Sequence, residues 1–312
     1  MRYRLFGYAE FSILGANATK QVDYEPAQRL LEILALERID LDLFLGQNEG
    51  RGTARLFGGQ VLSQALRAAM STVDADRRPH SLHGYFMRPG DPQRPVLYEV
   101  DRIRDGRSFT TRRVVAIQDG KAILNMSVSL QISEEGMSHD KAMPNVPPPE
   151  ELKDDLERAK AESEDNPRMG PMAKQQRAFE LRSVIAPWEA GERFFSPVWM
   201  RFRGEADVQD SALQHALLTY ASDVGLVSTA TLPHIDSTPR NSLMMASLDH
   251  ALWIHRQPEL DDWFLFAKRT STASGARGLS HAEFYTRDGE LIASVSQEGL
   301  MRPYRARGAD SK

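Results

Sequence analysis

The sequence predicts an α+β fold made of two tandem units, each a long central helix wrapped by an antiparallel sheet. Two kinds of observation support this: a helix followed by alternating strands occurs twice in the same order, and short motifs recur between the halves. The 312 residues are 41% hydrophobic and 26% charged. That composition is typical of a globular protein with one large domain or two of average size.

Two helices are expected early in the first unit, which we place at residues 27–133. In Ala27–Leu36, leucines recur at helical spacing. The glycines at 58 and 59 then lead into a second helix. Its small and aliphatic side chains lie on one broad face, at Val61, Leu62, Ala65, Leu66 and Ala69. Such small residues suit a helix that a sheet encloses closely.

Four strand-like runs follow these helices and are separated by turn motifs such as Asp105-Gly106 and Asp119-Gly120. The runs are His80–Arg88, Val96–Arg104, Phe109–Gln118 and Ala122–Gln131. In the last run, aliphatic and polar side chains alternate, which predicts one buried face and one polar face. The first unit is therefore expected to end in an antiparallel meander.

Charged residues and prolines dominate residues 134–174, and we interpret residues 134–194 as a linker with an exposed helix at 150–164. Residues 1–26 are interpreted as an N-terminal extension, and residues 303–312 as a C-terminal tail.

The second unit, residues 195–302, repeats the order of the first. A helix is expected at Ser211–Ser222, followed by strands near Met244–His255, Trp263–Thr272, Arg277–Thr286 and Glu290–Met301. Ser81-Leu82 recurs as Ser247-Leu248, and Asp119-Gly120 recurs as Asp288-Gly289, at nearly the same offset. Such matches suggest duplication. A helix held by an antiparallel sheet, twice over, is a double hotdog fold.

The repeat singles out one polar residue, Gln297. Aligning the two Asp-Gly turns places Leu124, Met126 and Val128 opposite Ala293, Val295 and Gln297. On this face a buried amide without a partner costs about 1 to 3 kcal/mol. Gln297 should therefore have a partner or a ligand, unless its end of the strand has already reached solvent.

Two further polar residues complete a candidate hydrolytic site. Asp223 closes the second central helix, where it could be a general base or ordinary helix-end polarity; Ser247 opens a strand, where exposed serines are common. With Gln297, they supply a carboxylate to deprotonate water and a hydroxyl and an amide to position it. Backbone amides at Gly58-Gly59-Gln60 could stabilise an oxyanion.

Other chemistries find little support in the sequence. The chain has no cysteine, which excludes thiolate nucleophiles and thiolate metal sites. It also lacks the Gly-x-Ser-x-Gly, His-Glu-x-x-His and nucleotide-binding glycine motifs. His250 and His255 are five residues apart and would face opposite sides of a strand. We therefore expect no metal and no cofactor. A net charge of −4 does not favour nucleic acid as a partner.

Long ordered motifs give the sequence a resemblance to acyl-CoA thioesterase II. They are Phe57-Gly58-Gly59-Gln60, the run from His80 to Asp91, the run from Arg104 to Phe109, Tyr220-Ala221-Ser222-Asp223, Ser247-Leu248-Asp249-His250 and Gln297-Glu298-Gly299. The resemblance implies a double hotdog that hydrolyses medium- to long-chain fatty acyl-CoA. It also implies that Asp223, Ser247 and Gln297 hold the attacking water, with serine in place of the threonine of some relatives. A homo-oligomer is expected on the same basis.

Two other functions stay open at this point: a hotdog enoyl-thioester hydratase, and a non-catalytic acyl-CoA binding protein. No apolar run approaches the roughly 20 residues that span a bilayer, so no membrane insertion is expected. Peroxisomal relatives end in Ser-Lys-Leu, whereas this chain ends in Asp310-Ser311-Lys312. A cytoplasmic location is therefore expected.

Overall fold

The computed structural model describes residues 25–49, 54–165, 173–174, 177–191, 193–238 and 242–304. The extension expected at 1–26 lies outside these ranges except for its last two residues, and so does most of the tail expected at 303–312. The first described element is helix α1, which runs from Glu25 to Leu34 and confirms the helix expected near its position.

The first unit is a six-stranded sheet against helix α2 (Gly58–Met70). Its strands are β1 (Glu37–Asp40), β2 (Leu43–Gly46), β3 (Arg78–Phe86), β4 (Val96–Asp105), β5 (Phe109–Gln118) and β6 (Lys121–Gln131). They lie in the order β1-β2-β4-β5-β6-β3. The four strands expected from the sequence are confirmed within a few residues.

The second unit builds the same arrangement around helix α5 (Ser211–Ser222). Its strands are β7 (Phe179–Ser183), β8 (Phe195–Phe202), β9 (Leu243–Ser247), β10 (Asp249–Ile254), β11 (Phe264–Ser274), β12 (Arg277–Thr286) and β13 (Leu291–Pro303). They lie in the order β10-β13-β12-β11-β8-β7, and β9 pairs with the far part of β13. A short helix, α6 (Leu226–Thr229), follows α5.

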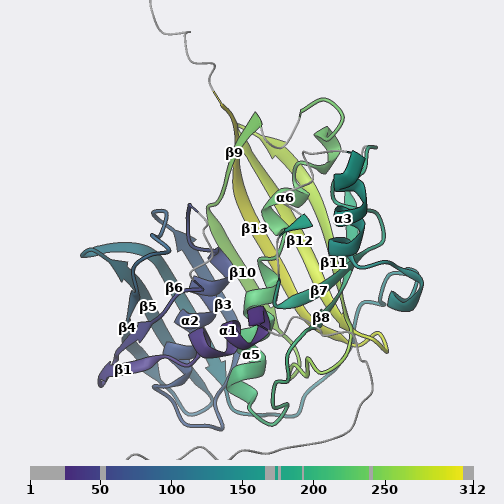
Figure 1. Cartoon of the computed structure of the whole chain (residues 1–312). Helices are drawn as coiled ribbons and strands as arrows, with labels where there is room; N and C mark the ends of the chain where they lie inside the picture. Colours follow the sequence, from purple (N-terminus) through teal and green to yellow (C-terminus); the bar gives the residue numbers. More distant parts are fainter. Residues whose placement is uncertain are drawn as a thin grey trace, which may run out of the picture.

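The two units join edge to edge through β3 and β10, which occupy equivalent places in the two sheets. Leu82 of β3 pairs with Leu252 of β10, and the pairing is antiparallel like the others described. One continuous sheet of thirteen strands results, with the first unit in purple to blue and the second in teal to yellow (Figure 1). The structure is a double hotdog.

The strand registers agree with the alignment of the two halves. In the first unit, Arg112 of β5 pairs with Val128 of β6. In the second, Ser280 of β12 pairs with Gln297 of β13. Gln297 therefore occupies the place that Val128 has in the first unit, on the face of the sheet that the helices cover.

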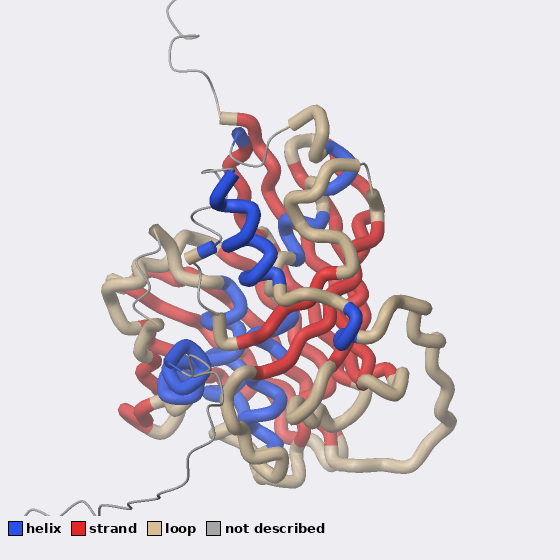
Figure 2. Tube along the Cα trace, turned by 45° about the vertical axis from the view of Figure 1, so that its right-hand side comes forward, coloured by secondary structure: helices blue, strands red, loops and turns tan. Residues whose placement is uncertain are grey.

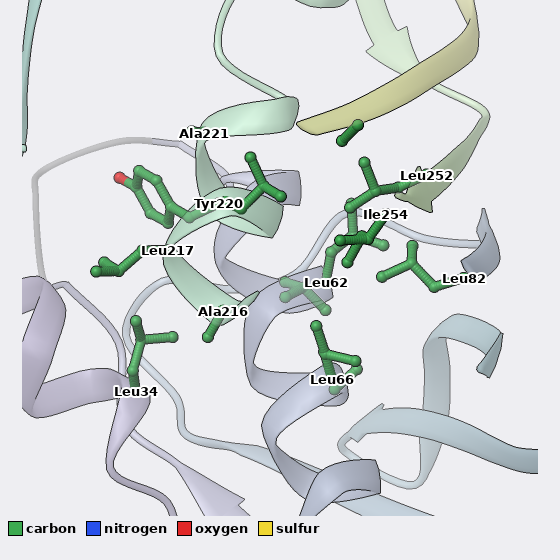
Figure 3. Close-up of a cluster of buried hydrophobic side chains, with 14 of the residues drawn as sticks. Leu34, Leu62, Leu66, Leu82, Ala216, Leu217, Tyr220, Ala221, Leu252 and Ile254 are labelled. Atoms are coloured by element: carbon green, nitrogen blue, oxygen red, sulfur yellow. The ribbon is translucent and has the colours of Figure 1, made fainter. Parts of the chain in front are cut away.

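The core lies where α2 and α5 pack side by side against the strands (Figure 2). Leu62 and Leu66 of α2 are fully buried and approach Leu82 and Leu252 from the joined edge strands (Figure 3). Burying a leucine side chain contributes roughly 1.5 to 3 kcal/mol. The packing therefore places α2 against the edge strands of both units.

The sequence did not reveal four of the strands, β1, β2, β7 and β8. β1 and β2 have four residues each, and all four residues of β1 are exposed, so hydrophobic alternation is absent or very short there. β7 lies inside the segment that was interpreted as a linker. The expected strand 244–255 is also divided at Leu248 into β9 and β10.

The helix expected at 150–164 forms later, as α3 (Asp155–Asp165), after a short 3-10 turn. It is not wholly exposed, because Asp155 and Ala159 are buried against β7. Asp155 accepts hydrogen bonds from the backbone and the hydroxyl of Ser183. The acidic composition of α3 gave no indication of this contact in the sequence. Within the described ranges, no helix is long and apolar enough to cross a membrane.

Candidate functional site

The structure brings Asp223, Ser247 and Gln297 together. The amide nitrogen of Gln297, Nε2, lies 2.9 Å from Oδ1 of Asp223 and 2.5 Å from Oγ of Ser247. Gln297 is 1% exposed and Asp223 is 5% exposed, while Ser247 is half-buried. The expectation that Gln297 needs a partner is confirmed, and it does not lie at a solvated strand end.

Asp223 lies at the point where α5 ends, and it is the C-terminal cap of that helix. Gly225 follows with a φ of +70°, a left-handed conformation that turns the chain away from the helix axis. The short helix α6 begins directly after this turn. The turn holds the Asp223 side chain at the junction of the two units.

The second carboxylate oxygen of Asp223 is bound by the other unit. The backbone N–H of Gly59, in the first turn of α2, donates to Oδ2 at 2.8 Å. Phe57, the N-terminal cap of α2, offers no side-chain hydrogen bond there. Asp223 thus satisfies an amide that the helix leaves open, and the positive end of the helix dipole favours its negative charge.

Burial nevertheless dominates the electrostatics of this carboxylate. Loss of hydration raises the pKa of Asp223 to about 6, although the hydrogen bonds from Gln297 and Gly59 lower it. A carboxylate with such a pKa accepts a proton more readily than an exposed aspartate does. It remains largely ionised at neutral pH, which is the state that a general base requires.

The Gly59 interaction corrects one expectation from the sequence. The amides of Gly58-Gly59-Gln60 were considered as possible oxyanion donors, but the Gly59 N–H is bonded to Asp223. A β-carbon on Gly58 would lie 2.7 Å from Oδ2 of Asp223, so the backbone here passes very close to the carboxylate. The glycines permit this approach between helix and acid.

Sequence reasoning did not include His250 in the site. Its imidazole is buried on the helix-covered face of β10, and Nε2 lies 2.9 Å from Oγ of Ser222. Burial lowers the pKa of His250 to about 4. The signal in the sequence was its alternation with Leu252 and Ile254, which places all three on the buried face. The described residues contain no group of three or more possible metal ligands from His, Cys, Asp and Glu.

A cavity of about 460 Å³ opens beside the ends of the two central helices. Apolar side chains make up much of its wall, among them Leu56, Phe57, Phe179, Leu181, Val198 and Leu232. Asp223, Ser247 and Gln297 do not line it. Two residues that do line it are close to them in the chain or the fold: Val224 directly follows Asp223, and Phe57 directly precedes Gly58. Tyr220 also lines the cavity and packs edge to face on Phe57, with ring centroids 4.9 Å apart. The cavity and the polar cluster therefore share the same helix ends.

Comparison with known proteins agrees with this architecture. A family model described as acyl-CoA thioesterase matches residues 174–300, and one described as acyl-CoA thioesterase N-terminal domain matches residues 48–131. Acyl-CoA thioesterase 2 of Haemophilus influenzae is 36% identical over 280 residues, which cover 88% of this chain and 96% of the relative. The chain belongs to the acyl-CoA thioesterase family.

Other members of the family extend this likeness. Human acyl-coenzyme A thioesterase 8 is 37% identical to this thioesterase, over 86% of this chain and 88% of the relative. The crystal structure of acyl-CoA thioesterase II TesB2 from Mycobacterium marinum superposes with a TM-score of 0.73 at 38% identity, covering 88% of this chain and 98% of that one. A hotdog protein of unknown function from Alicyclobacillus acidocaldarius superposes equally well, with a TM-score of 0.73, at 20% identity, which shows the fold alone.

Proposed function

We propose that this acyl-CoA thioesterase hydrolyses its substrate by direct attack of a water molecule that Asp223, Ser247 and Gln297 hold. The observation that carries the proposal is the single amide of Gln297, which donates to both Asp223 and Ser247. Buried side chains that share such a donor have little freedom to reorient. Fixed orientation of a nucleophile is a large part of what an enzyme contributes to its reaction.

In the proposed reaction, Asp223 takes a proton from the water as its oxygen bonds to the thioester carbon. The tetrahedral intermediate then collapses, the carbon–sulfur bond breaks, and Asp223 returns the proton to the departing thiolate of CoA. Gln297 and Ser247 keep the water in line with the carboxylate. Because Ser247 Oγ accepts from Gln297, its own proton is available to a water or to the substrate oxygen.

The acyl group is proposed to be a medium- to long-chain fatty acyl chain that enters the cavity beside the site. The cavity volume of about 460 Å³ falls in the usual range for small-molecule pockets, roughly 300 to 1,000 Å³. The apolar part of its wall favours a hydrocarbon chain over a polar one. Its nearness to the ends of α2 and α5 would leave the thioester carbon beside Asp223.

One assay tests the proposal directly. The purified protein is incubated with palmitoyl-CoA and octanoyl-CoA, and free CoA is followed with a thiol reagent. We expect CoA release by the wild type and a large loss with Asp223→Asn, while Asp249→Asn serves as a control at a neighbouring, half-buried aspartate. If Asp223→Asn releases CoA at the wild-type rate, another group activates the water.

We also propose a homo-oligomer that acts in the cytoplasm. Large side chains are exposed near the β3–β10 junction, among them Tyr85, Met87 and Trp253, and such surfaces often meet another subunit. The absence of cysteine is compatible with a reducing compartment. Light scattering during size-exclusion chromatography tests the assembly, and a monomer at micromolar concentration would refute it. Cell fractionation tests the location.

A further inference from the structure

Three buried polar side chains form a row across neighbouring strands of the second unit. Ser280 of β12 pairs directly with Gln297 of β13. On the other side of β13, Ala251 of β10 pairs with Ser296, so His250 lies next to Gln297 on the same face. Each of the three, His250, Gln297 and Ser280, is no more than 1% exposed. His250 and Gln297 of this row contact Ser222 and Asp223 at the end of α5.

Each member of this row keeps one polar atom without a hydrogen-bond partner among the described residues. These atoms are Nδ1 of His250, Oε1 of Gln297 and Oγ of Ser280. Buried polar atoms are nearly always paired, so the two neighbours of Gln297 are the natural donors to its oxygen. An amide whose nitrogen alone is bound can exchange its two ends by rotation, and that rotation would turn Oε1 toward Asp223.

We propose that His250 is a positioning residue for the thioesterase reaction: its neutral imidazole donates a hydrogen bond from Nδ1 to Oε1 of Gln297 and accepts one at Nε2 from Ser222. The hydrogen bonds then run in one direction, from Ser222 through His250 and Gln297 to Asp223 and Ser247. This fixes the Gln297 nitrogen on the site. The effect on catalysis rests on the function proposed above for Gln297.

This direction requires Ser222 to share its hydroxyl proton between two acceptors. Its Oγ donates to the carbonyl oxygen of Thr219 at 2.7 Å and lies 2.9 Å from Nε2 of His250, so the Nδ1–H form shares this one proton between the two acceptors. If that proton went to Thr219 alone, Nε2 would carry the imidazole proton. The lone pair of Nδ1 would then face the lone pairs of the Gln297 oxygen. The Nδ1–H form avoids this repulsion and satisfies both buried atoms.

The buried surroundings also keep the ring neutral. Burial lowers the pKa of His250 to about 4, and an interaction with Gln297 only partly opposes this effect. A neutral ring has one donor and one acceptor, which is what a directed chain of hydrogen bonds needs. His250 accordingly acts through Gln297 and not as an acid or a base.

The tautomer can be measured without any turnover. Nitrogen-15 NMR of the full-length protein at pH 7 distinguishes protonated from unprotonated ring nitrogens, and loss of one signal pair in His250→Asn assigns this residue among the eight histidines. We expect Nδ1 to be protonated. A proton on Nε2 instead would overturn the proposal, whatever the enzyme's activity.

Kinetics then tests the consequence with a matched pair of variants. In His250→Asn an amide nitrogen can occupy the place of Nδ1, whereas in His250→Gln the amide reaches the place of Nε2 and leaves Gln297 without its donor. We expect kcat to fall about 10- to 100-fold in His250→Gln with little change in KM, and to stay within about threefold of wild type in His250→Asn. Thermal unfolding of both variants separates this pattern from misfolding, which would lower the melting temperature and kcat of both variants alike.

Ser280→Ala is the decisive comparison, because Ser280 flanks Gln297 on the opposite side. We expect it to keep the wild-type kcat. A loss as large as that of His250→Gln would assign the donor to Ser280 and refute the role of His250. If Asp223→Asn proves fully active while His250 carries its proton on Nδ1, the water mechanism fails and the hydrogen-bond chain remains as a structural feature.

Discussion

Gly59 and Asp223 are 164 residues apart in the chain, yet the backbone N–H of Gly59 donates to the Asp223 carboxylate at 2.8 Å. The acid at the end of one central helix thereby binds the beginning of the other. The candidate site consequently exists only when both hotdog units are folded and packed together. α2 and α5 lie side by side at this junction.

Replacing Asp223 with asparagine is expected to lower kcat by about 10² to 10⁴, with a much smaller effect on KM. The same change is expected to raise stability at pH 8. Because the folded-state pKa is raised from 3.8 to about 6, the folded wild type binds more protons than the unfolded chain between pH 4 and 6, so it loses stability as pH rises through that window. The stability that the wild type loses over this window approaches roughly 3 kcal/mol, since each pKa unit is worth about 1.4 kcal/mol.

Urea unfolding at pH 4 and pH 8 checks this expectation. The free energy of unfolding of Asp223→Asn should be closest to that of the wild type at pH 4. At pH 8 it should exceed that of the wild type. A variant that is less stable at both values would show that the carboxylate, and not its burial, holds the two helices together.

The pH profile of the wild type should report the same group. If ionised Asp223 is the base, kcat/KM rises about tenfold per pH unit below about pH 6 and levels off above it, with an apparent pKa near the value of about 6 for Asp223. His250, whose pKa is lowered to about 4, stays neutral across most of this range. A rate that is constant from pH 5 to pH 8 would exclude Asp223 as the titrating base.

Sequence periodicity predicted the fold well where a strand has one buried and one polar face. Residues 121–131 show such alternation, and β6 was placed within a residue of its bounds. The two Asp-Gly turns also identified Gln297 as the polar exception on a buried face, because they aligned β6 with β13. These signals are local, and they survive in a single sequence.

Long-range contacts could not be predicted in the same way. The Gly59 amide looked available to an oxyanion, because nothing in the sequence shows that Asp223 meets it from the other unit. His250 was considered only as a metal ligand together with His255, because its position beside Gln297 depends on pairing with the distant strand β13. The edge strands β1 and β7 are too short for any period to appear.

Ser247 should tolerate threonine and not alanine. Its Oγ accepts from Gln297 at 2.5 Å, and threonine keeps that hydroxyl while adding one methyl group to a half-buried position. We therefore expect Ser247→Thr to stay active and Ser247→Ala to lose much of its kcat. Steady-state kinetics with octanoyl-CoA measures both. Equal rates for Ser247→Ala and the wild type would remove this hydroxyl from the mechanism.

Alanine at Gly59 is expected to separate the two helices. Its β-carbon would lie 2.6 Å from the carbonyl oxygen of Tyr220 and 2.5 Å from a ring carbon of Phe57, both closer than van der Waals contact allows. The backbone must shift, which would break the bond to Asp223 and lower both activity and thermal stability. Gly136→Ala is the control, since nothing lies within 4 Å of its added carbon. Similar melting temperatures for the two variants would contradict the packing described here.

The size of the cavity should set the acyl chain length, and Val198 allows a test in both directions. It lies on β8, is 2% exposed, and lines the cavity together with Ser196 of the same strand. Val198→Phe fills part of the space, so kcat/KM for palmitoyl-CoA should fall at least tenfold more than that for octanoyl-CoA. Val198→Ala enlarges the space and should shift the ratio the other way.

Because an added ring in a packed region costs about 1 to 3 kcal/mol, the melting temperature of each variant is measured alongside, with Ile103→Phe on the exposed side of β4 as the control. If both substrates slow equally in Val198→Phe while the protein stays folded, the acyl chain binds elsewhere.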